Sequence, residues 1–194
     1  MPVSKTRAFT LAELLIALVI LGVIATFTIP KVLQSQQNSQ WKSQAKEVAG
    51  TLSGALSAYQ RNTPLDQNTF AYGLTPFINY VRIETATTMD GRQTTANAAC
   101  TSSTPCYRMH SGGMLRPVYC SFGSTSTTSI ISYIYDPDGI DSGTTNGTGK
   151  SVQFFIYMNG RITSKGGVLP NSMDGCANTE SPDPTQDPPW FSWN

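Results

Sequence analysis

The sequence predicts an α+β protein in which one long N-terminal helix packs on a small antiparallel sheet. Two observations carry this prediction. A helical pattern occupies the N-terminal part of the chain, and short segments rich in β-branched and aromatic residues follow in the second half. The chain has 194 residues, which is enough for one membrane helix and one globular domain.

The helical pattern begins with an apolar segment of membrane-spanning length. The 21 residues from Phe9 to Ile29 contain one ionisable side chain, Glu13. A membrane helix needs about 20 apolar residues, whereas the apolar part of a cleaved secretory signal has about 7–15. Lys5 and Arg7 precede the segment, so the leader should stay in the cytoplasm and the rest of the chain should lie outside it. A carboxylate inside such a segment is costly in lipid, which makes Glu13 a candidate functional residue.

The residues around Glu13 resemble a known processing site. The basic leader is followed by Ala8-Phe9-Thr10-Leu11-Ala12-Glu13-Leu14-Leu15. This segment resembles the N-terminal motif of type IV pilins and of the pseudopilins of type II secretion, with Ala8 where the family usually has glycine. In that family an inner-membrane prepilin peptidase cuts before the phenylalanine and methylates the new amino terminus. The resemblance implies cleavage between Ala8 and Phe9, N-methylation of Phe9, and a role for Glu13 in assembly.

The resemblance extends to Gly22 and Pro30, which stand where family members often carry a glycine and a proline. Proline lacks the N–H that would bond to the preceding turn and crowds the carbonyl of that turn, so Pro30 is expected to kink the helix. Gly22 would let helices approach closely in lipid. The alternative is a static kink without a role in assembly.

The helix is expected to continue as an amphipathic helix that ends near Arg61-Asn62, ahead of Pro64. Apolar residues recur there at intervals of three and four and form one stripe, which we interpret as core packing: Trp41, Ala45, Val48, Leu52, Leu56 and Tyr59. The predicted organisation has four parts: a cleaved leader (1–8), a membrane or filament-core helix (9–30), an amphipathic helix of the head (31–62) and a β-rich head with polar loops (63–194).

The second half of the chain predicts three or four antiparallel strands against this stripe. The candidate strands are Leu115–Phe122, Ser129–Tyr135, Val152–Met158 and Arg161–Ser164. Asn159-Gly160 is a two-residue hairpin signal between the last two. The stretch from Pro64 to Gly113 is expected to be a polar connector in which Thr85–Ala99 forms a surface loop or a short hairpin. The C-terminal tail ends Trp190-Phe191-Ser192-Trp193, and it either docks on the sheet of its own chain, is disordered, or offers a surface to a neighbouring subunit or a receptor.

The four cysteines are Cys100, Cys106, Cys120 and Cys176. An even number in an exported domain favours disulfides, and four cysteines allow 3 connectivities. The preferred pairing joins Cys100 to Cys106 and Cys120 to Cys176. Zinc is disfavoured because the chain has no CxxC pair and His110 is its only histidine.

A carboxylate-rich turn, Asp136-Pro137-Asp138-Gly139-Ile140-Asp141, is the one candidate cofactor site. Calcium takes oxygen ligands from loops of this kind, which makes Asp136, Asp138 and Asp141 candidate ligands. The spacing is not that of an EF-hand, and Asp-Pro and Asp-Gly are also common turn formers. A structural turn is therefore the preferred interpretation, calcium is the alternative, and no other cofactor is expected.

Composition and motifs argue against several functional classes. The formal net charge is +1 and charged residues make up 13% of the chain, so no specific nucleic-acid binding is predicted. His110 lies in no nucleophile elbow, and the chain has no phosphate loop or dinucleotide fingerprint, so no enzyme is predicted.

The resemblance implies a structural subunit of a type IV pilus or pseudopilus. Its partners would be prepilin peptidase, other pilin subunits and the bacterial inner membrane. The precursor would sit in that membrane with its head outside the cytoplasm, and the mature subunit in a surface pilus or a periplasmic pseudopilus. The alternatives are a minor or tip pilin that binds a surface or DNA, and a signal-anchored exported protein that does not assemble.

Overall fold

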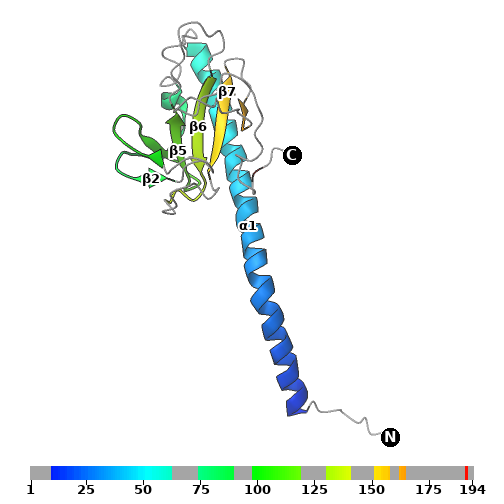
Figure 1. Ribbon diagram of the computed structural model, residues 1–194. Coiled ribbons are helices and arrows are strands. Elements are labelled where there is room, and N and C mark those ends of the chain that lie inside the picture. The colour runs from blue at the N-terminus through cyan, green and yellow to red at the C-terminus, as the bar shows by residue number, and fades with distance from the viewer. Residues whose placement is uncertain are drawn as a thin grey trace, which may run out of the picture. The chain divides into compact units, whose positions relative to one another are not determined.

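A computed structural model describes residues 10–62, 74–89, 98–118, 130–140, 151–157, 162–164 and 191. The chain divides into two compact units, Met1–Ser39 and Gln40–Asn194. Both contribute to a single helix, α1 (Leu11–Asn62) (Figure 1). We call the part of α1 in the first unit the stem, and the second unit the head.

Within the head, α1 buries the predicted apolar stripe. The buried residues of the helix are Ala45, Val48, Ala49, Leu52, Ala55, Leu56 and Tyr59, and Trp41 is partly buried at the start of the stripe. Their spacing of three and four places them on one face, and that face meets the sheet. The helix ends at Asn62, as the sequence predicted. The stripe is therefore confirmed as core packing.

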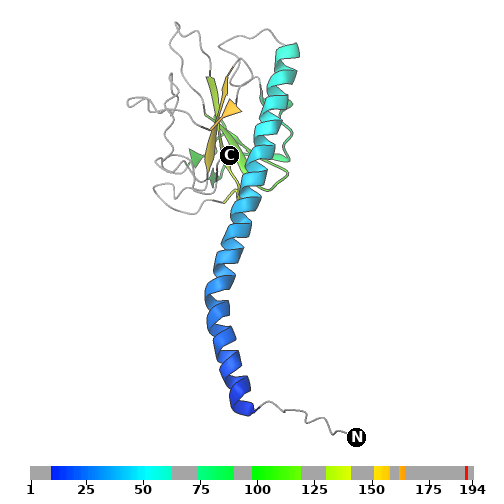
Figure 2. The ribbon, with the colours of Figure 1, turned by 90° about the vertical axis from the view of Figure 1, so that its right-hand side faces the viewer.

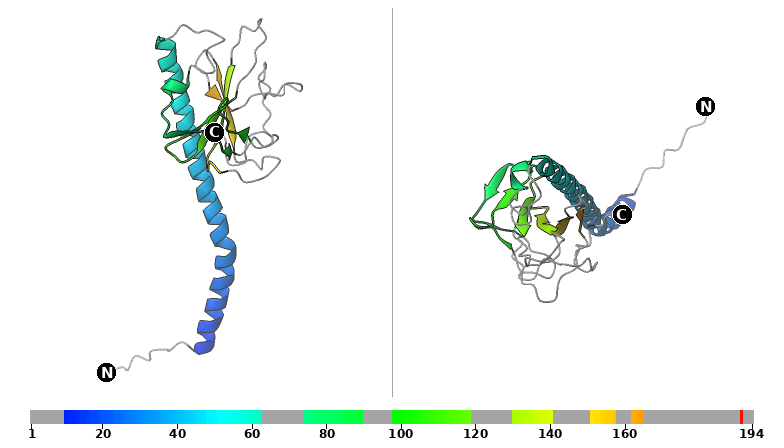
Figure 3. Two further views of the ribbon diagram at one scale, coloured as in Figure 1. Left: turned by 90° about the vertical axis from the view of Figure 1, so that its left-hand side faces the viewer. Right: turned by 90° about the horizontal axis from the view of Figure 1, so that it is seen from above.

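The head contains a six-stranded antiparallel sheet in the order β1-β4-β5-β6-β7-β8. Its strands are β1 (Arg82–Glu84), β4 (Cys106–Arg108), β5 (Met114–Val118), β6 (Ile130–Asp136), β7 (Val152–Tyr157) and β8 (Ile162–Thr163). A short 3-10 helix, η1 (Thr75–Phe77), precedes β1. Figures 2 and 3 show the head part of α1 lying along one face of this sheet. The fold is thus α+β and pilin-like, as predicted.

The predicted strands are confirmed within the described residues, and the sheet is larger than expected. β7 and β8 fall inside their candidate strands, whereas β5 begins one residue before its candidate strand, at Met114, and β6 ends one residue after its own, at Asp136. β7 pairs with β8 around the predicted Asn159-Gly160 turn, which lies outside the described residues. The two additional strands, β1 and β4, come from the stretch expected to be a polar connector. Each has three residues and carries arginine, and β1 also carries glutamate, so neither shows the apolar alternation that identifies a strand in sequence.

Side chains alternate across the sheet with a period of two. Tyr133 and Tyr135 on β6 and Phe154 on β7 belong to the cluster that packs with the α1 stripe. The ring of Phe191 packs edge-on against Phe154, with centroids 6.0 Å apart, so this residue of the aromatic tail docks on its own chain. Phe155, on the opposite face, is also only 1% exposed. Both faces of the sheet are therefore buried at the central strands β6 and β7.

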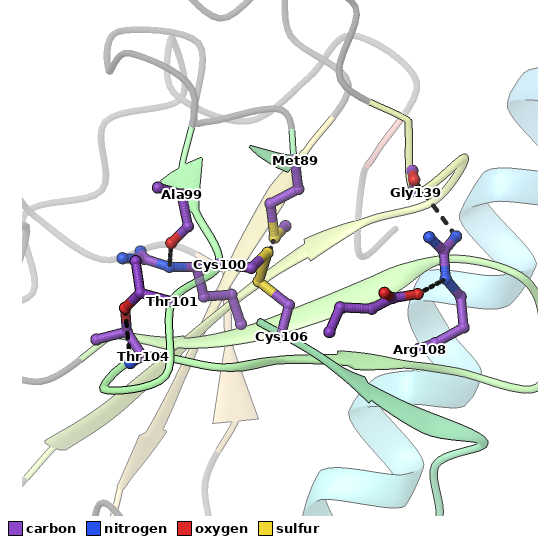
Figure 4. Close-up of a disulfide and its surroundings, with 10 residues drawn as sticks. Met89, Ala99, Cys100, Thr101, Thr104, Cys106, Arg108 and Gly139 are labelled. Atoms are coloured by element: carbon purple, nitrogen blue, oxygen red, sulfur yellow. Dashed lines mark hydrogen bonds and ion pairs between the residues drawn. A yellow bond between two sulfur atoms is a disulfide. The ribbon is translucent and has the colours of Figure 1, made fainter. Parts of the chain in front are cut away.

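A second, smaller cluster surrounds the Cys100–Cys106 disulfide. It joins the two-stranded sheet of β2 (Thr88–Met89) and β3 (Ala98–Ala99) to the larger sheet, and confirms that Thr85–Ala99 contains a short hairpin pairing. The disulfide packs with Met89, Met114 and Ile134, all buried. In Figure 4 the sulfur of Met89 points at the disulfide, and its Sδ lies 3.8 Å from Cys106 Sγ. The preferred Cys100–Cys106 pairing is present, whereas Cys120 and Cys176 lie outside the described residues.

Candidate assembly site

The stem begins with a reciprocal cap between Thr10 and Glu13. The backbone N–H and the hydroxyl of Thr10 both donate to Glu13 Oε2 at 2.9 Å, and Glu13 N–H donates to Thr10 Oγ1 at 3.3 Å. This is a capping box, in which the N-cap residue and the residue three positions later satisfy each other's free backbone donors. The carboxylate of Glu13 therefore has local hydrogen bonds within its own chain. Ala8 and Phe9, the predicted cleavage site, lie outside the described residues.

Beyond this cap the stem exposes an apolar surface on all sides. Most of its large apolar side chains are more than half exposed, from Leu11 at 78% to Leu33 at 54%. Among the described residues, α1 is the one helix long and apolar enough to cross a membrane, and none of its most apolar 18-residue window is buried. A core helix of a water-soluble protein would bury this surface, so exposure separates the stem from that class.

The stem remains helical through Pro30. Proline cannot donate to the carbonyl one turn earlier, which belongs to Thr26. The hydroxyl of Thr26 donates to Gly22 O at 2.7 Å and that of Thr28 to Ile24 O at 2.9 Å. Such back-bonds satisfy polar groups that lipid would leave without a partner, and they often bend helices. Gly22 lies about two turns before Pro30. A Cβ added to Gly22 would meet nothing within 4 Å, so no other described segment of the chain packs against Gly22.

In the head, the turn between β4 and β5 is tied to α1, to β6 and to Asn79, which follows η1. Gln44 Nε2 on α1 donates to Ser111 O at 3.4 Å, and the hydroxyls of Ser111 and Tyr135 lie 3.1 Å apart. His110 Nε2 lies 3.2 Å from Asn79 Oδ1. The turn therefore has a fixed position against α1 and β6.

A pocket opens between α1 and this turn. It is lined by Glu47, Val48, Thr51, Asn79, Met109, His110 and Ser111, and with its open mouth it spans about 330 Å³. Val48 and Met109 are 2% and 5% exposed and make an apolar floor, whereas Glu47 is exposed at the rim. Burial, with smaller contributions from the carboxylates of Asp136 and Glu47, raises the pKa of nearby Tyr135 to about 12. The lining residues include one carboxylate, that of Glu47, so the rim of the pocket is acidic.

The Asp136 turn shows how two of the three candidate calcium ligands are used. Asp136 is fully buried at the end of β6, and Asp138 Oδ1 accepts a hydrogen bond from Ile140 N–H at 3.2 Å, as in an Asx turn. Arg108 Nη1 donates to Gly139 O at 3.3 Å and to Gly112 O at 2.8 Å. A guanidinium thus contacts a carbonyl of this turn. No group of three metal-binding side chains occurs among the described residues, and Asp141 is not one of them, so the calcium alternative stays untested.

Two features of these sites were not predicted. The capping box had a sequence signal, Thr10-x-x-Glu13 ahead of an apolar run, which the membrane interpretation of Glu13 obscured. Arg108 had none, because its contacts come from three segments separated in sequence: Glu84, at 3.6 Å from its Nε, Gly112 and Gly139.

Comparison with known proteins agrees with the geometry of the stem. No curated protein and no solved structure matches the chain. Residues 3–29 match the model of the prokaryotic N-terminal methylation motif. This match covers the leader from Val3 onward, the Thr10–Glu13 cap and the apolar segment through Ile29. The chain therefore carries the N-terminal signature of type IV pilins and pseudopilins, which supports a membrane-anchored precursor that is a substrate of prepilin peptidase.

Proposed function

We propose that this protein is a structural subunit of a type IV pilus or pseudopilus that assembles through its stem. The observation that carries the proposal is the placement of the methylation motif directly on an apolar helix whose large side chains are exposed and which has one carboxylate, Glu13. Cleavage before Phe9 would leave a positive amino terminus at the start of this helix. The exposed surface of Leu14–Ile24 would then bury against neighbouring stems and form the filament core.

Glu13 would set the register of this assembly. An unpaired carboxylate is costly in an apolar environment, and pairing with an opposite charge offsets much of that cost. In the single chain, Thr10 supplies the hydrogen bonds that Glu13 accepts. In a filament the Phe9 amine of a neighbouring subunit would supply the opposite charge. Glu13 therefore has two separable roles, a helix cap within the subunit and a charge partner between subunits.

Two substitutions separate the roles. Glu13→Gln retains an oxygen that can accept from Thr10 but removes the charge, whereas Glu13→Ala removes both. Each variant should be exported and processed, which N-terminal mass spectrometry of membrane fractions would check by finding the methylated Phe9 peptide. Sheared surface fractions and periplasmic filaments, viewed by electron microscopy, report assembly.

We expect both variants to fail in assembly, because both lack the negative charge that would pair with the Phe9 amine of a neighbouring subunit. Normal filaments from Glu13→Gln would contradict charge pairing and leave only the cap. A wild-type chain that retains Met1–Ala8 would instead favour the non-assembling, signal-anchored alternative.

A further inference from the structure

Lys31 and Glu47 are among the charged residues of α1 that have no ion-pair partner in the described part of the chain. Glu84 takes part in both ion pairs of this part of the chain, with Arg82 and Arg108. Glu47 has Ser43, Gln44, Gly50 and Thr51 at the helical positions three and four residues away, and Lys31 has Phe27, Thr28, Gln34 and Ser35. None of these can offer an opposite charge, so neither residue is satisfied within its helix.

The pocket beside Glu47 has the chemistry of a lysine site. Its floor of Val48 and Met109 is apolar, and its rim carries the Glu47 carboxylate and the Asn79 and His110 side chains. A lysine stem packs well on an apolar floor while its ammonium group reaches a carboxylate. An anionic side chain would meet Glu47 instead, so the pocket selects against it.

Apolar residues near the pocket and near Lys31 add to the match between the two surfaces. Val81 and Ile83 are 56% and 49% exposed, and Val81 N–H donates to Arg108 O at 2.8 Å, which places Val81 beside Met109 of the pocket floor. On the stem, Lys31 has one exposed apolar neighbour in helical position, Phe27, which is 69% exposed and stands four residues earlier. A basic residue beside an apolar side chain thus has a matching surface in an acidic pocket flanked by apolar side chains.

We propose that Lys31 of one copy of this chain inserts into the Glu47 pocket of a second copy. The inference rests on the proposed function, because assembly through the stem would bring many copies of both segments together. Lys31 precedes Glu47 by about four turns of the same helix, so the pair needs two copies displaced lengthwise. This contact would join the stem of one subunit to the head of another and add a second charge pair to that of Glu13.

Carbodiimide cross-linking tests the contact without any substitution, because it forms an amide only between an amine and a carboxylate in direct contact. Filaments assembled from a mixture of isotopically light and heavy subunits are treated and digested for mass spectrometry. We expect a peptide in which Lys31 of a light chain is joined to Glu47 of a heavy chain, and the reverse. Linkage of Glu47 to Lys46 of another copy, or no linkage at Glu47, would overturn the assignment.

Charge reversal gives an independent measurement. Lys31→Glu and Glu47→Lys should each lower filament yield by about fivefold or more, and the double variant should restore it, since one ion pair contributes on the order of 1 kcal/mol. Lys46→Glu, a neighbouring charge outside the pocket lining, is the matched control and should change the yield by less than about twofold. Single variants that are not rescued by the double variant would refute the pair. Failure of the wild-type chain to form filaments would refute the proposed function itself, and this contact with it.

Discussion

Removing the Cys100–Cys106 disulfide should loosen one part of the head and leave the rest folded. The two cysteines are separated by 6 residues, and the chain-entropy relation for a loop of that length gives about 2 kcal/mol of stabilisation. That change would lower Tm by roughly 4–8 °C if the whole chain unfolded as one unit, so a local loss should lower it by less. The change to test is the double variant Cys100→Ala with Cys106→Ala, which avoids burying a new hydroxyl.

The loss should be local because the disulfide belongs to its own cluster. Its neighbours, Met89, Met114 and Ile134, are distinct from the residues that pack on α1. Hydrogen exchange of the full chain in detergent micelles resolves the two regions. The amide at position 100, which donates to Thr87 O at 2.8 Å, should lose protection, whereas the amides of Leu52 and Leu56 should keep it.

Ser102→Ala is the control, because Ser102 is exposed in the same loop and its replacement leaves the disulfide in place. Equal loss of protection at Leu52 and at position 100 would show that the head unfolds as one unit, and the division into two clusters would then be wrong. Unchanged protection at both would refute the claim that the disulfide anchors the β2–β3 hairpin.

Two further predictions concern the main core. Leu52→Ala should destabilise the head by about 2–5 kcal/mol in chemical denaturation, because the side chain is fully buried on the α1 stripe, while Ser53→Ala at the next, exposed position should change stability by less than about 0.5 kcal/mol; equal effects would contradict the packing of this face. Burial raises the pKa of Tyr135 to about 12 in the folded head, whereas a tyrosine in the unfolded chain has a pKa near 10. The free energy of unfolding that comes from this difference is fully present below pH 10. It falls by roughly 2–3 kcal/mol as the pH rises toward 12. Ultraviolet titration should show a late-ionising tyrosine that Tyr135→Phe removes, and its persistence in that variant would refute the assignment.

The parts of the fold that the sequence predicts best are those with strong periodicity. The α1 stripe from Ala45 to Tyr59 repeats at three and four, and β7 combines β-branched and aromatic residues next to a hairpin signal. In both segments the apolar residues are the ones that become buried, so the local sequence was sufficient to predict the helix and the strand. β1 and β4 are strands because of their neighbours: β4 pairs with both β1 and β5, which satisfies backbone groups of short, charged segments. That pairing is a property of the tertiary structure and leaves little trace in local composition.

The candidate sites also divide into those that local sequence predicts and those that it does not. Glu13 was identified because a carboxylate in an apolar run is unusual wherever the helix lies. The Cys100–Cys106 pairing was a preference among the connectivities that four cysteines allow, and the structure contains it. The Glu47 pocket could not be predicted, because its walls come from α1, from Asn79 after η1 and from the β4–β5 turn. Only the fold brings these segments together. In the sequence, Glu47 cannot be distinguished from other charged residues on the solvent-exposed face of an amphipathic helix.

The separation of the disulfide cluster from the α1 core has a consequence for sequence divergence. The two clusters have no buried residue in common, but Met114 and Ile134 adjoin Leu115 and Tyr135 along β5 and β6. Substitutions in the hairpin, such as those at Met89, should therefore combine with changes under α1 more nearly additively than substitutions at Met114 or Ile134. The β2–β3 hairpin with its disulfide can therefore change in sequence without compensating changes beneath α1. In the proposed filament, such a module would let the hairpin vary while the stem that would hold the subunits together stays the same.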